Sequence, residues 1–150
     1  IKILFVCHGN ICRSPMAEFV MKRYVREAGL EKQFGIASAA TSREELGNPV
    51  YPPARAELAR HGISCEGKRA VQLTRSDYEK YDYFIGMDRA NIRNMHRILE
   101  GDSDGKIYKL LTFADRSDDV ADPWYSGDFE TTYKDVVEGC EALLQFVLTK

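Results

Sequence analysis

Residues 3–15 decide the fold of this chain, and they read Ile3-Leu4-Phe5-Val6-Cys7-His8-Gly9-Asn10-Ile11-Cys12-Arg13-Ser14-Pro15. The first four residues form a short apolar run, which is typical of a strand buried on both faces of a parallel sheet. A hydroxyl residue followed by proline, as in Ser14-Pro15, is typical of a helix start with Ser14 at the N-cap. The stretch therefore predicts a strand, a glycine-containing loop and a helix, in that order.

The predicted loop carries the residues of an oxyanion site. Its backbone N–H groups can point inward, and the helix dipole adds positive potential at the same place. The dipole and the guanidinium of Arg13 favour the thiolate of Cys7, which is the nucleophilic form. Arg13 can bind two phosphate oxygens at once, which lysine cannot do. Gly9 permits close approach of a ligand and Asn10 tolerates left-handed dihedral angles, so we predict thiolate chemistry on a phosphate-like dianion.

Strand and helix signals alternate along the rest of the chain. We expect further strands over residues 34–40, 83–86 and 107–111, helices over 15–28, 54–61, 90–99 and 133–148, and a helical turn over 76–80. Residues 41–53 and the acidic residues 115–128 are typical of loops. This alternation predicts an α/β fold, a doubly wound four-stranded parallel sheet with helices on both faces and a phosphate-binding loop after the first strand. In such sheets ligands bind beyond the carboxyl ends of the strands, where Cys7 lies.

The composition indicates a single domain over residues 1–150. The chain is 44% hydrophobic and 29% charged, which suits one globular core. Its net charge is −2 with no long run of one sign, which argues against nucleic acid or an anionic membrane as a partner. No apolar stretch reaches the length of a membrane span and no signal peptide precedes the first strand, so we expect a cytoplasmic protein.

Four cysteines are present, Cys7, Cys12, Cys65 and Cys140. A chain of this size and hydrophobicity can fold without disulfides, so we expect reduced thiols. The sequence has no CxxC pair and its three histidines are scattered, so we expect no metal site. Cys140 falls on the apolar face of the last predicted helix and should pack in the core. We assign no role to Cys65.

A thiolate that takes a phosphoryl group needs a proton donor for the departing oxygen, unless the leaving group is very acidic. The acidic loop offers five candidates, and spacing alone does not choose among Asp115, Asp118, Asp119, Asp122 and Asp128. Asp122 is favoured because Pro123 holds it extended and two aromatic residues, Trp124 and Tyr125, adjoin it. Their rings could desolvate the carboxyl group, which favours its protonated form, and could also flank a substrate ring.

Three motifs, in order along the chain, together resemble the low-molecular-weight protein tyrosine phosphatase family. They are the loop Cys7–Ser14, the segment Ser38-Ala39-Ala40-Thr41-Ser42 and the segment Asp122-Pro123-Trp124-Tyr125. The resemblance covers nearly the whole chain. It implies a metal-independent, cysteine-dependent phosphatase that needs no cofactor and hydrolyses phosphotyrosine in proteins. The expected partner is a phosphotyrosine-containing protein, with a tyrosine kinase as one candidate, and the oligomeric state stays open between monomer and weak homodimer.

The resemblance also implies a role for each matched residue. Cys7 would be the nucleophile, Arg13 the phosphate clamp and Asp122 the general acid and then the base, with a cysteinyl-phosphate linking the two steps. The phosphate-binding loop and its supports would be His8, Gly9, Asn10, Ile11, Cys12, Ser14 and Ser38. In the family, hydrogen bonds among the residues matched by Asn10, Ser14 and Ser38 hold the loop, and the serine matched by Ser14 stabilises the thiolate. Trp124 and Tyr125 match the aromatic wall, and Cys12 matches a cysteine that can bridge to the nucleophile on oxidation.

Four residues depart from the family's pattern. His8 stands where an aliphatic residue is common, which predicts a more polar pocket floor. Glu44 stands in the substrate wall where several relatives have an aromatic residue, so the peptide preference stays open. Lys68 and Val71 stand where many relatives have histidine and arginine, so the hydrogen-bond network around the loop must differ.

Three other functions fit parts of the sequence. Phosphoarginine phosphatases on the same scaffold tend to carry threonine where this chain has Ile11, and isoleucine packs against a ring whereas a hydroxyl can bond a guanidinium. An arsenate reductase needs two further redox cysteines, and residues 85–88 contain none where one is expected. A non-catalytic oxyanion-binding or redox-sensing module would not need Asp122. We therefore favour phosphotyrosine hydrolysis.

Overall fold

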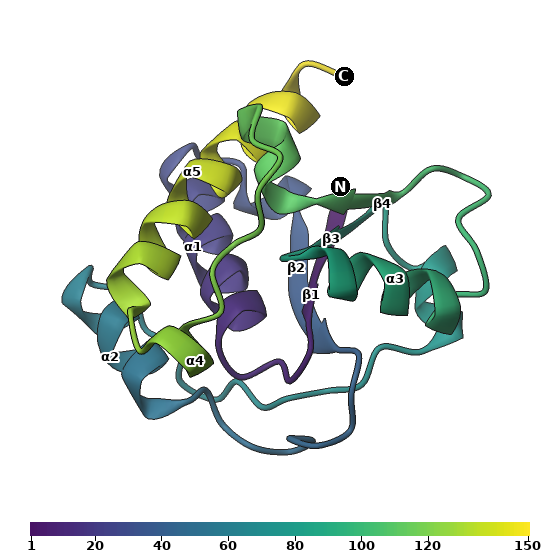
Figure 1. The fold of residues 1–150 in the computed structure, drawn as a ribbon. Helices are drawn as coiled ribbons and strands as arrows, with labels where there is room; N and C mark the ends of the chain where they lie inside the picture. The colour runs from purple at the N-terminus through teal and green to yellow at the C-terminus, as the bar shows by residue number, and fades with distance from the viewer.

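The computed structural model describes all of residues 1–150 and arranges them as alternating strands and helices (Figure 1). The strands are β1 (Lys2–Cys7), β2 (Gly35–Ala40), β3 (Tyr83–Gly86) and β4 (Ile107–Lys109). They form one sheet in the order β2-β1-β3-β4, and every neighbouring pair is parallel. The prediction of a four-stranded parallel sheet is confirmed.

Successive residues of β1 point to opposite faces of the sheet, as the period of two in a strand requires. Ile3 and Phe5 belong to the larger of two apolar clusters, which lies on one face. Leu4 and Val6 belong to the smaller cluster on the other face. Both faces are therefore covered, which explains why the strand is apolar throughout rather than alternating.

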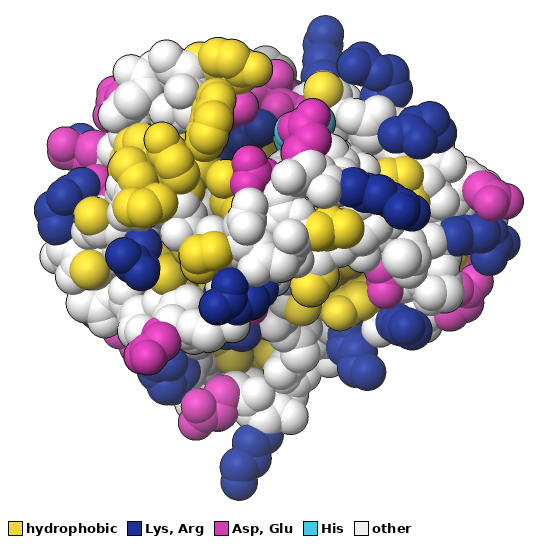
Figure 2. Space-filling model, turned by 90° about the horizontal axis from the view of Figure 1, so that it is seen from below, with side chains coloured by type: hydrophobic (Ala, Val, Ile, Leu, Met, Phe, Trp, Pro, Cys, Tyr) yellow, Lys and Arg dark blue, Asp and Glu magenta, His cyan; other side chains and the backbone are white.

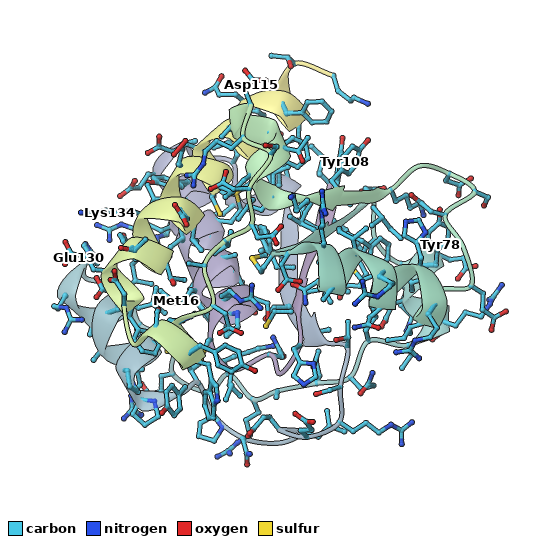
Figure 3. All side chains as sticks on the ribbon, viewed as in Figure 1. Met16, Tyr78, Tyr108, Asp115, Glu130 and Lys134 are labelled. Carbon is cyan, nitrogen blue, oxygen red and sulfur yellow. The ribbon has the colours of Figure 1, made fainter.

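Helices cover both faces, as predicted. The larger cluster is covered by α1 (Arg13–Glu27), α2 (Pro52–Arg60) and α5 (Phe129–Leu148), and the smaller one by α3 (Arg89–Ile98) and the 3₁₀ turn η2 (Arg75–Glu79). Met16 of α1 is fully buried, whereas Glu130 and Lys134 pair with each other on the outer side of α5 (Figure 3). No helix combines the length and the apolarity that crossing a bilayer requires.

Three of the predicted boundaries are wrong for local reasons. Ser14 is not an N-cap, because α1 already begins at Arg13 and the Ser14 hydroxyl contacts side chains of the preceding loop. The strand predicted over 107–111 ends at Lys109, where the buried residues that follow form the 3₁₀ turn η3 (Leu110–Ala114). The last helix begins four residues earlier than predicted, because Asp128 accepts a hydrogen bond from the backbone N–H of Thr131 and caps it. Two short helices, η1 (Glu31–Gln33) and α4 (Pro123–Ser126), complete the fold, and α4 lies inside the predicted loop 115–128.

The strand order creates a crevice at the carboxyl end of the sheet. From β1 the chain crosses to β2 on one side, and it later returns to β3 and β4 on the other side. The connections after β1 and β3 therefore diverge, which is the topological switch point where α/β sheets bind ligands. Cys7 ends β1, and Asp88 lies two residues beyond the end of β3. The fold thus places both residues beside the same crevice.

Candidate active site

The loop after β1 is held from outside through its carbonyl groups. The carbonyls of Cys7, His8 and Ile11 accept hydrogen bonds from the backbone N–H groups of Thr41, Ser42 and Tyr51. Asn10 adopts φ = 59°, the left-handed region that asparagine tolerates. The N–H groups of His8, Gly9, Ile11, Cys12 and Arg13 make no hydrogen bond within the protein. These donors lie at the N-terminus of α1 and are available to an anion.

The thiol of Cys7 is buried and surrounded by donors. Its Sγ lies 3.0 Å from Ser14 Oγ and accepts a hydrogen bond of 3.3 Å from the backbone N–H of Asn10. The side-chain amide of Asn10 donates to Ser14 Oγ at 2.8 Å and to Ser38 Oγ at 2.9 Å. Both amide protons of Asn10 are then used, and Ser14 keeps its own proton for the sulfur. The Ser14 hydroxyl is therefore free to donate to the Cys7 sulfur.

The direction of this hydrogen-bond chain is fixed at its far end by Glu18. Ser38 Oγ donates to Glu18 Oε1 at 2.5 Å, because an ionised carboxylate can only accept. The backbone N–H of Val71 donates to Asn10 Oδ1 at 3.1 Å, which fixes the orientation of the Asn10 amide. The sequence reasoning missed Glu18. The available signal was its spacing, four residues after Ser14 on the same face of one helix.

Lys68 completes the buried network under the loop. Its Nζ donates to the carbonyl oxygen of Ser38 at 3.0 Å and lies 3.6 Å from Glu18 Oε1. Lys22 pairs with the other Glu18 oxygen at 2.6 Å, so two ammonium groups face one buried carboxylate. Burial lowers the pKa of Lys68, and attraction to Glu18 partly offsets this effect. Lys68, a departure from the family's pattern, thus belongs to the network that orients Asn10.

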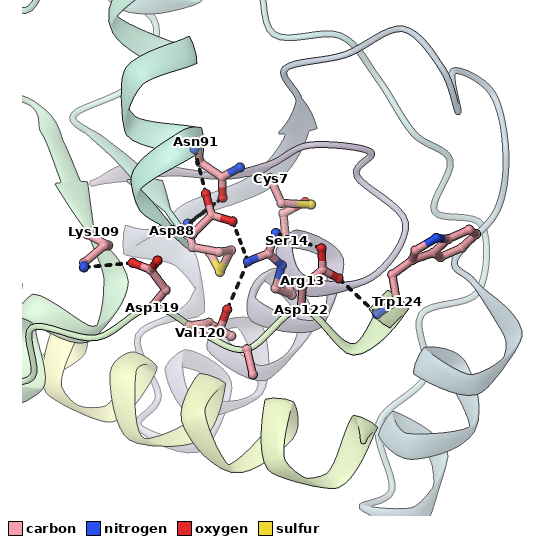
Figure 4. A network of polar contacts seen from close by, with 12 residues as sticks. Cys7, Arg13, Ser14, Asp88, Asn91, Lys109, Asp119, Val120, Asp122 and Trp124 are labelled. Atoms are coloured by element: carbon pink, nitrogen blue, oxygen red, sulfur yellow. Dashed lines mark hydrogen bonds and ion pairs between the residues drawn. The ribbon is translucent and has the colours of Figure 1, made fainter. Parts of the chain in front are cut away.

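Arg13 is buried and divides its donors between the protein and the cavity. Its Nη1 lies 2.8 Å from Asp88 Oδ2 and donates to the carbonyl oxygen of Val120 at 3.0 Å (Figure 4). Nη2 lies 3.5 Å from Asp122 Oδ2. Both protons of Nη1 are then used, and those of Nε and Nη2 remain for an oxyanion. Burial alone would lower the pKa of Arg13, but the negative charges of Cys7, Asp88 and Asp122 outweigh it, so the pKa is raised.

Asp88 is the functional residue that the sequence reasoning missed in this part of the site. One of its carboxylate oxygens faces Arg13, and the other accepts a hydrogen bond of 2.7 Å from the backbone N–H of Asn91. Asp88 therefore caps α3 and holds Arg13 at the same time. Its place just beyond β3, at the carboxyl edge of the sheet, was the signal that could have found it.

Asp122 is the one acidic loop residue that reaches the cavity. It is the N-cap of α4, where its Oδ1 accepts a hydrogen bond of 3.0 Å from the backbone N–H of Trp124. Its side chain is 35% exposed, so it contacts both solvent and Arg13. Three of the other candidates are engaged elsewhere, Asp118 with Arg116, Asp119 with Lys109 and Asp128 at the cap of α5, and Asp115 follows η3 outside the cavity.

These groups surround a cavity of about 150 Å³ that opens to solvent, lined by Cys7, His8, Gly9, Ile11, Cys12, Arg13, Glu44, Glu45, Asp122 and Trp124. His8 is exposed, and its Nε2 lies 2.9 Å from Glu44 Oε2, so it pairs at the cavity mouth rather than forming a polar floor. His8 and Glu44, two of the four residues that depart from the family's pattern, lie 36 residues apart in the sequence and contact each other. A Cβ atom at Gly9 would lie 3.4 Å from Glu45 Cγ, which shows how closely the opposite wall approaches.

The two aromatic residues of the predicted wall have different positions. Trp124 lines the cavity, and its ring packs against Tyr51 with 4.8 Å between centroids. Tyr125 is 86% exposed and does not line the cavity. Figure 2 shows the molecule from below, and on this lower face hydrophobic side chains gather in one area next to acidic ones. The aromatic wall thus consists of Trp124 supported by Tyr51, and Tyr125 lies outside it.

The other cysteines are buried free thiols. Burial, with smaller contributions from the charges of Cys7 and Asp122, raises the pKa of Cys12 to about 12, so this thiol is protonated at neutral pH. Cys140 packs in the core as predicted, and Cys65 is buried in the same larger cluster. No group of three or more histidine, cysteine, aspartate or glutamate side chains is arranged to hold a metal ion.

Comparisons with known proteins show the family to which this chain belongs. The family model for low molecular weight phosphotyrosine protein phosphatase matches residues 2–150. The low molecular weight protein-tyrosine-phosphatase YfkJ of Bacillus subtilis is 39% identical over 96% of this chain and 94% of its own length. The crystal structure of YfkJ superimposes with a TM-score of 0.96 and covers 99% of this chain and 95% of that one.

Proteins from two animals also match this chain. The low molecular weight phosphotyrosine protein phosphatase of Gallus gallus is 38% identical over 95% of this chain and 93% of its own length. The crystal structure of a Drosophila arginine phosphatase matches with a TM-score of 0.90 and 27% identity, over 98% of each chain. With the family model spanning all but the first residue, this chain belongs to the low-molecular-weight phosphotyrosine protein phosphatases.

Proposed function

We propose that residues 1–150 form one phosphatase domain that hydrolyses phosphotyrosine in proteins through a cysteinyl-phosphate intermediate. One observation carries the proposal. The sulfur of Cys7 accepts hydrogen bonds beside the free N–H groups of its loop and of Arg13, and Asp122 lies 3.5 Å from the same guanidinium. A nucleophile, an oxyanion site and an acid therefore converge on one cavity.

In the first step the thiolate of Cys7 attacks the phosphorus in line with the tyrosyl oxygen. The S–P bond forms and the P–O bond to tyrosine breaks, while the protonated carboxyl of Asp122 gives its proton to the departing oxygen. The loop N–H groups and the free protons of Arg13 stabilise the negative charge on the phosphoryl oxygens. The products of this step are tyrosine and phosphorylated Cys7.

In the second step water releases the phosphate. The carboxylate of Asp122 now accepts a proton from water, and the water oxygen attacks the phosphorus. The S–P bond breaks, its electron pair returns to Cys7 as a thiolate, and inorganic phosphate leaves. Ser14 can donate to this thiolate as it forms again, at the 3.0 Å separation described above. Asp122 ends protonated, ready for the next cycle.

The cavity walls favour an aromatic leaving group. Ile11 offers an apolar surface and Trp124 an aromatic one, and both suit a phenyl ring, whereas a guanidinium would find acceptors only in lining carboxylates such as Glu44 and Glu45. We therefore expect a peptide with phosphotyrosine to be hydrolysed with a kcat/KM at least about 100-fold higher than peptides with phosphoserine or phosphoarginine. A side-by-side assay of phosphate release from three peptides of matched sequence measures this ratio. A phosphoarginine peptide that is hydrolysed as fast as the phosphotyrosine peptide would instead support the alternative substrate.

Replacing Asp122 with alanine should slow the reaction most for poor leaving groups. Loss of a general acid should lower kcat/KM about 100-fold for phenyl phosphate, whose phenolate needs a proton. The loss should be less than about tenfold for 4-nitrophenyl phosphate, whose leaving group is stable without one. Steady-state kinetics on both esters test this, and Asp119→Ala is a matched control from the same loop. Equal losses on the two esters would remove Asp122 from the role of acid.

A further inference from the structure

Two successive carbonyl groups precede Asp122, and a side chain holds each of them. Arg13 Nη1 donates to the carbonyl oxygen of Val120 at 3.0 Å (Figure 4). Thr132 Oγ1 donates to the carbonyl oxygen of Ala121 at 2.9 Å. The next residue along the chain is Asp122 itself. Its backbone position therefore depends on a pair of anchors, one from the phosphate loop and one from α5.

Thr132 is placed unusually for a threonine within a helix. Its side chain is fully buried in the first turn of α5, whereas its neighbours Glu130 and Thr131 are exposed. A helical threonine commonly bonds the carbonyl four residues earlier, and Thr132 Oγ1 does lie 3.4 Å from the Asp128 carbonyl oxygen. The hydroxyl has one proton, and the shorter contact to Ala121 is the better hydrogen bond. The hydroxyl therefore ties α5 to the acid loop rather than only to its own helix.

The other end of the acid loop is attached to the same helix. Arg116 Nη1 lies 3.0 Å from Asp135 and 3.0 Å from Glu138, both on α5. Between the two attachments, the backbone N–H of Val120 donates to the carbonyl of Met87, beyond β3. The segment 116–121 is thus fixed at both ends by α5 and between them by the chain that follows β3. Thr132 is the attachment that lies next to the carboxyl group of Asp122.

From this geometry we infer that Thr132 is a positioning residue for the general acid, acting through the Ala121 carbonyl to hold Asp122 over the cavity. The inference rests on the proposed role of Asp122. Thr132 lies on α5 rather than among the residues that line the cavity, and its effect should reach only the proton transfers that Asp122 performs. It should not alter the affinity of the loop for phosphate.

Thr132→Val removes the hydroxyl and keeps the shape of the side chain. We expect kcat/KM to fall about tenfold for phenyl phosphate, because misplacement of a catalytic group by a fraction of an ångström is costly. For 4-nitrophenyl phosphate the loss should be less than about threefold, since its leaving group needs little protonation. The inhibition constant of inorganic phosphate should stay unchanged. Thr131→Val removes the neighbouring hydroxyl, which donates to Asp128 and not to the Ala121 carbonyl, so it is the matched control and should show neither effect.

Two further comparisons separate positioning from a general loss of packing. Thr132→Ser and Thr132→Ala both lack the γ-methyl group, and only the serine variant keeps the hydroxyl. The serine variant should therefore hydrolyse phenyl phosphate within about twofold of the parent rate, and the alanine variant should not. In a chain that already carries Asp122→Ala, Thr132→Val should have no further effect on kcat/KM, because coupled residues are not additive.

Equal losses on both esters, failure of serine to preserve activity, or a full Thr132→Val effect in the Asp122→Ala chain would each overturn the inference. These outcomes are distinct from a failure of the proposed function. If Asp122→Ala alone lost the same activity on both esters, the acid would be another group, whatever Thr132 does.

Discussion

Cys7→Ser should abolish turnover while leaving phosphate binding intact. A serine hydroxyl at this position is not ionised at neutral pH and cannot form the sulfur–phosphorus bond, so kcat should fall at least about 10⁴-fold, as loss of a covalent nucleophile does in other enzymes. The loop N–H groups and the free donors of Arg13 are unchanged, and these supply the binding of the anion. Steady-state phosphate release and calorimetric titration with inorganic phosphate measure the two properties separately.

Cys65→Ser is the matched control for this experiment. Cys65 is as buried as Cys7 but lies outside the catalytic cavity, so its replacement tests the cost of a buried serine without touching the reaction. We expect this variant to keep kcat and to lose only thermal stability. If the Cys7→Ser protein retained turnover within about tenfold of the parent, the nucleophile would have to be another group.

Arg13→Lys should lower kcat/KM for phosphotyrosine about 1,000-fold, equivalent to about 4 kcal/mol of transition-state stabilisation. The guanidinium makes its contacts to Asp88 and Val120 through one nitrogen and keeps the donors of Nε and Nη2 for the phosphoryl oxygens. An ammonium group has one nitrogen and three protons, so it cannot hold the same two partners and also bind an oxyanion in a fork. Comparison of kcat/KM between parent and variant measures the loss.

The control for Arg13→Lys is Arg55→Lys, at an exposed arginine whose side chain makes no hydrogen bond or ion pair within the protein. This second variant should behave like the parent. The kcat/KM of Asp88→Asn should lie between those of the two variants, because the amide still caps α3 but no longer offers a charge to Arg13. A lysine variant with nearly full activity would show that a positive charge is sufficient and that the planar fork is not needed.

The sequence was most informative where chemistry and local structure coincide in adjacent residues. The stretch from Ile3 to Pro15 predicted a buried strand, an anion-binding loop and a helix, and all three are present. Serine followed by proline is a common helix start, which predicts that α1 begins at Pro15. In the structure the Ser14 hydroxyl contacts Cys7 and Asn10, so a chemical task has displaced its usual capping role.

Contacts between distant segments were much harder to predict. Asp88 and Arg13 meet because β3 lies beside β1, and this adjacency depends on the strand order rather than on any spacing in the sequence. Glu18 and Lys68 likewise meet only in the folded chain, where the loop that follows α2 contacts α1. Among five loop aspartates, local pattern favoured Asp122 through Pro123, but only the fold brings its carboxyl group to Arg13. The local pattern also favoured both Trp124 and Tyr125 as the aromatic wall, but only Trp124 lines the cavity.

The outward hydrogen bonds of the catalytic loop have a consequence for the entropy of catalysis. Because its carbonyls are held by Thr41, Ser42 and Tyr51, the loop is ordered when the chain folds, and little conformational entropy remains to be lost when a substrate binds. Two of those three partners directly follow β2, which is an edge strand of the sheet. Local opening of that edge would release the loop while the rest of the core stayed folded. Activity should therefore disappear on heating before the helices unfold. Hydrogen exchange at the backbone amides of residues 41 and 42 would report the temperature at which this edge opens.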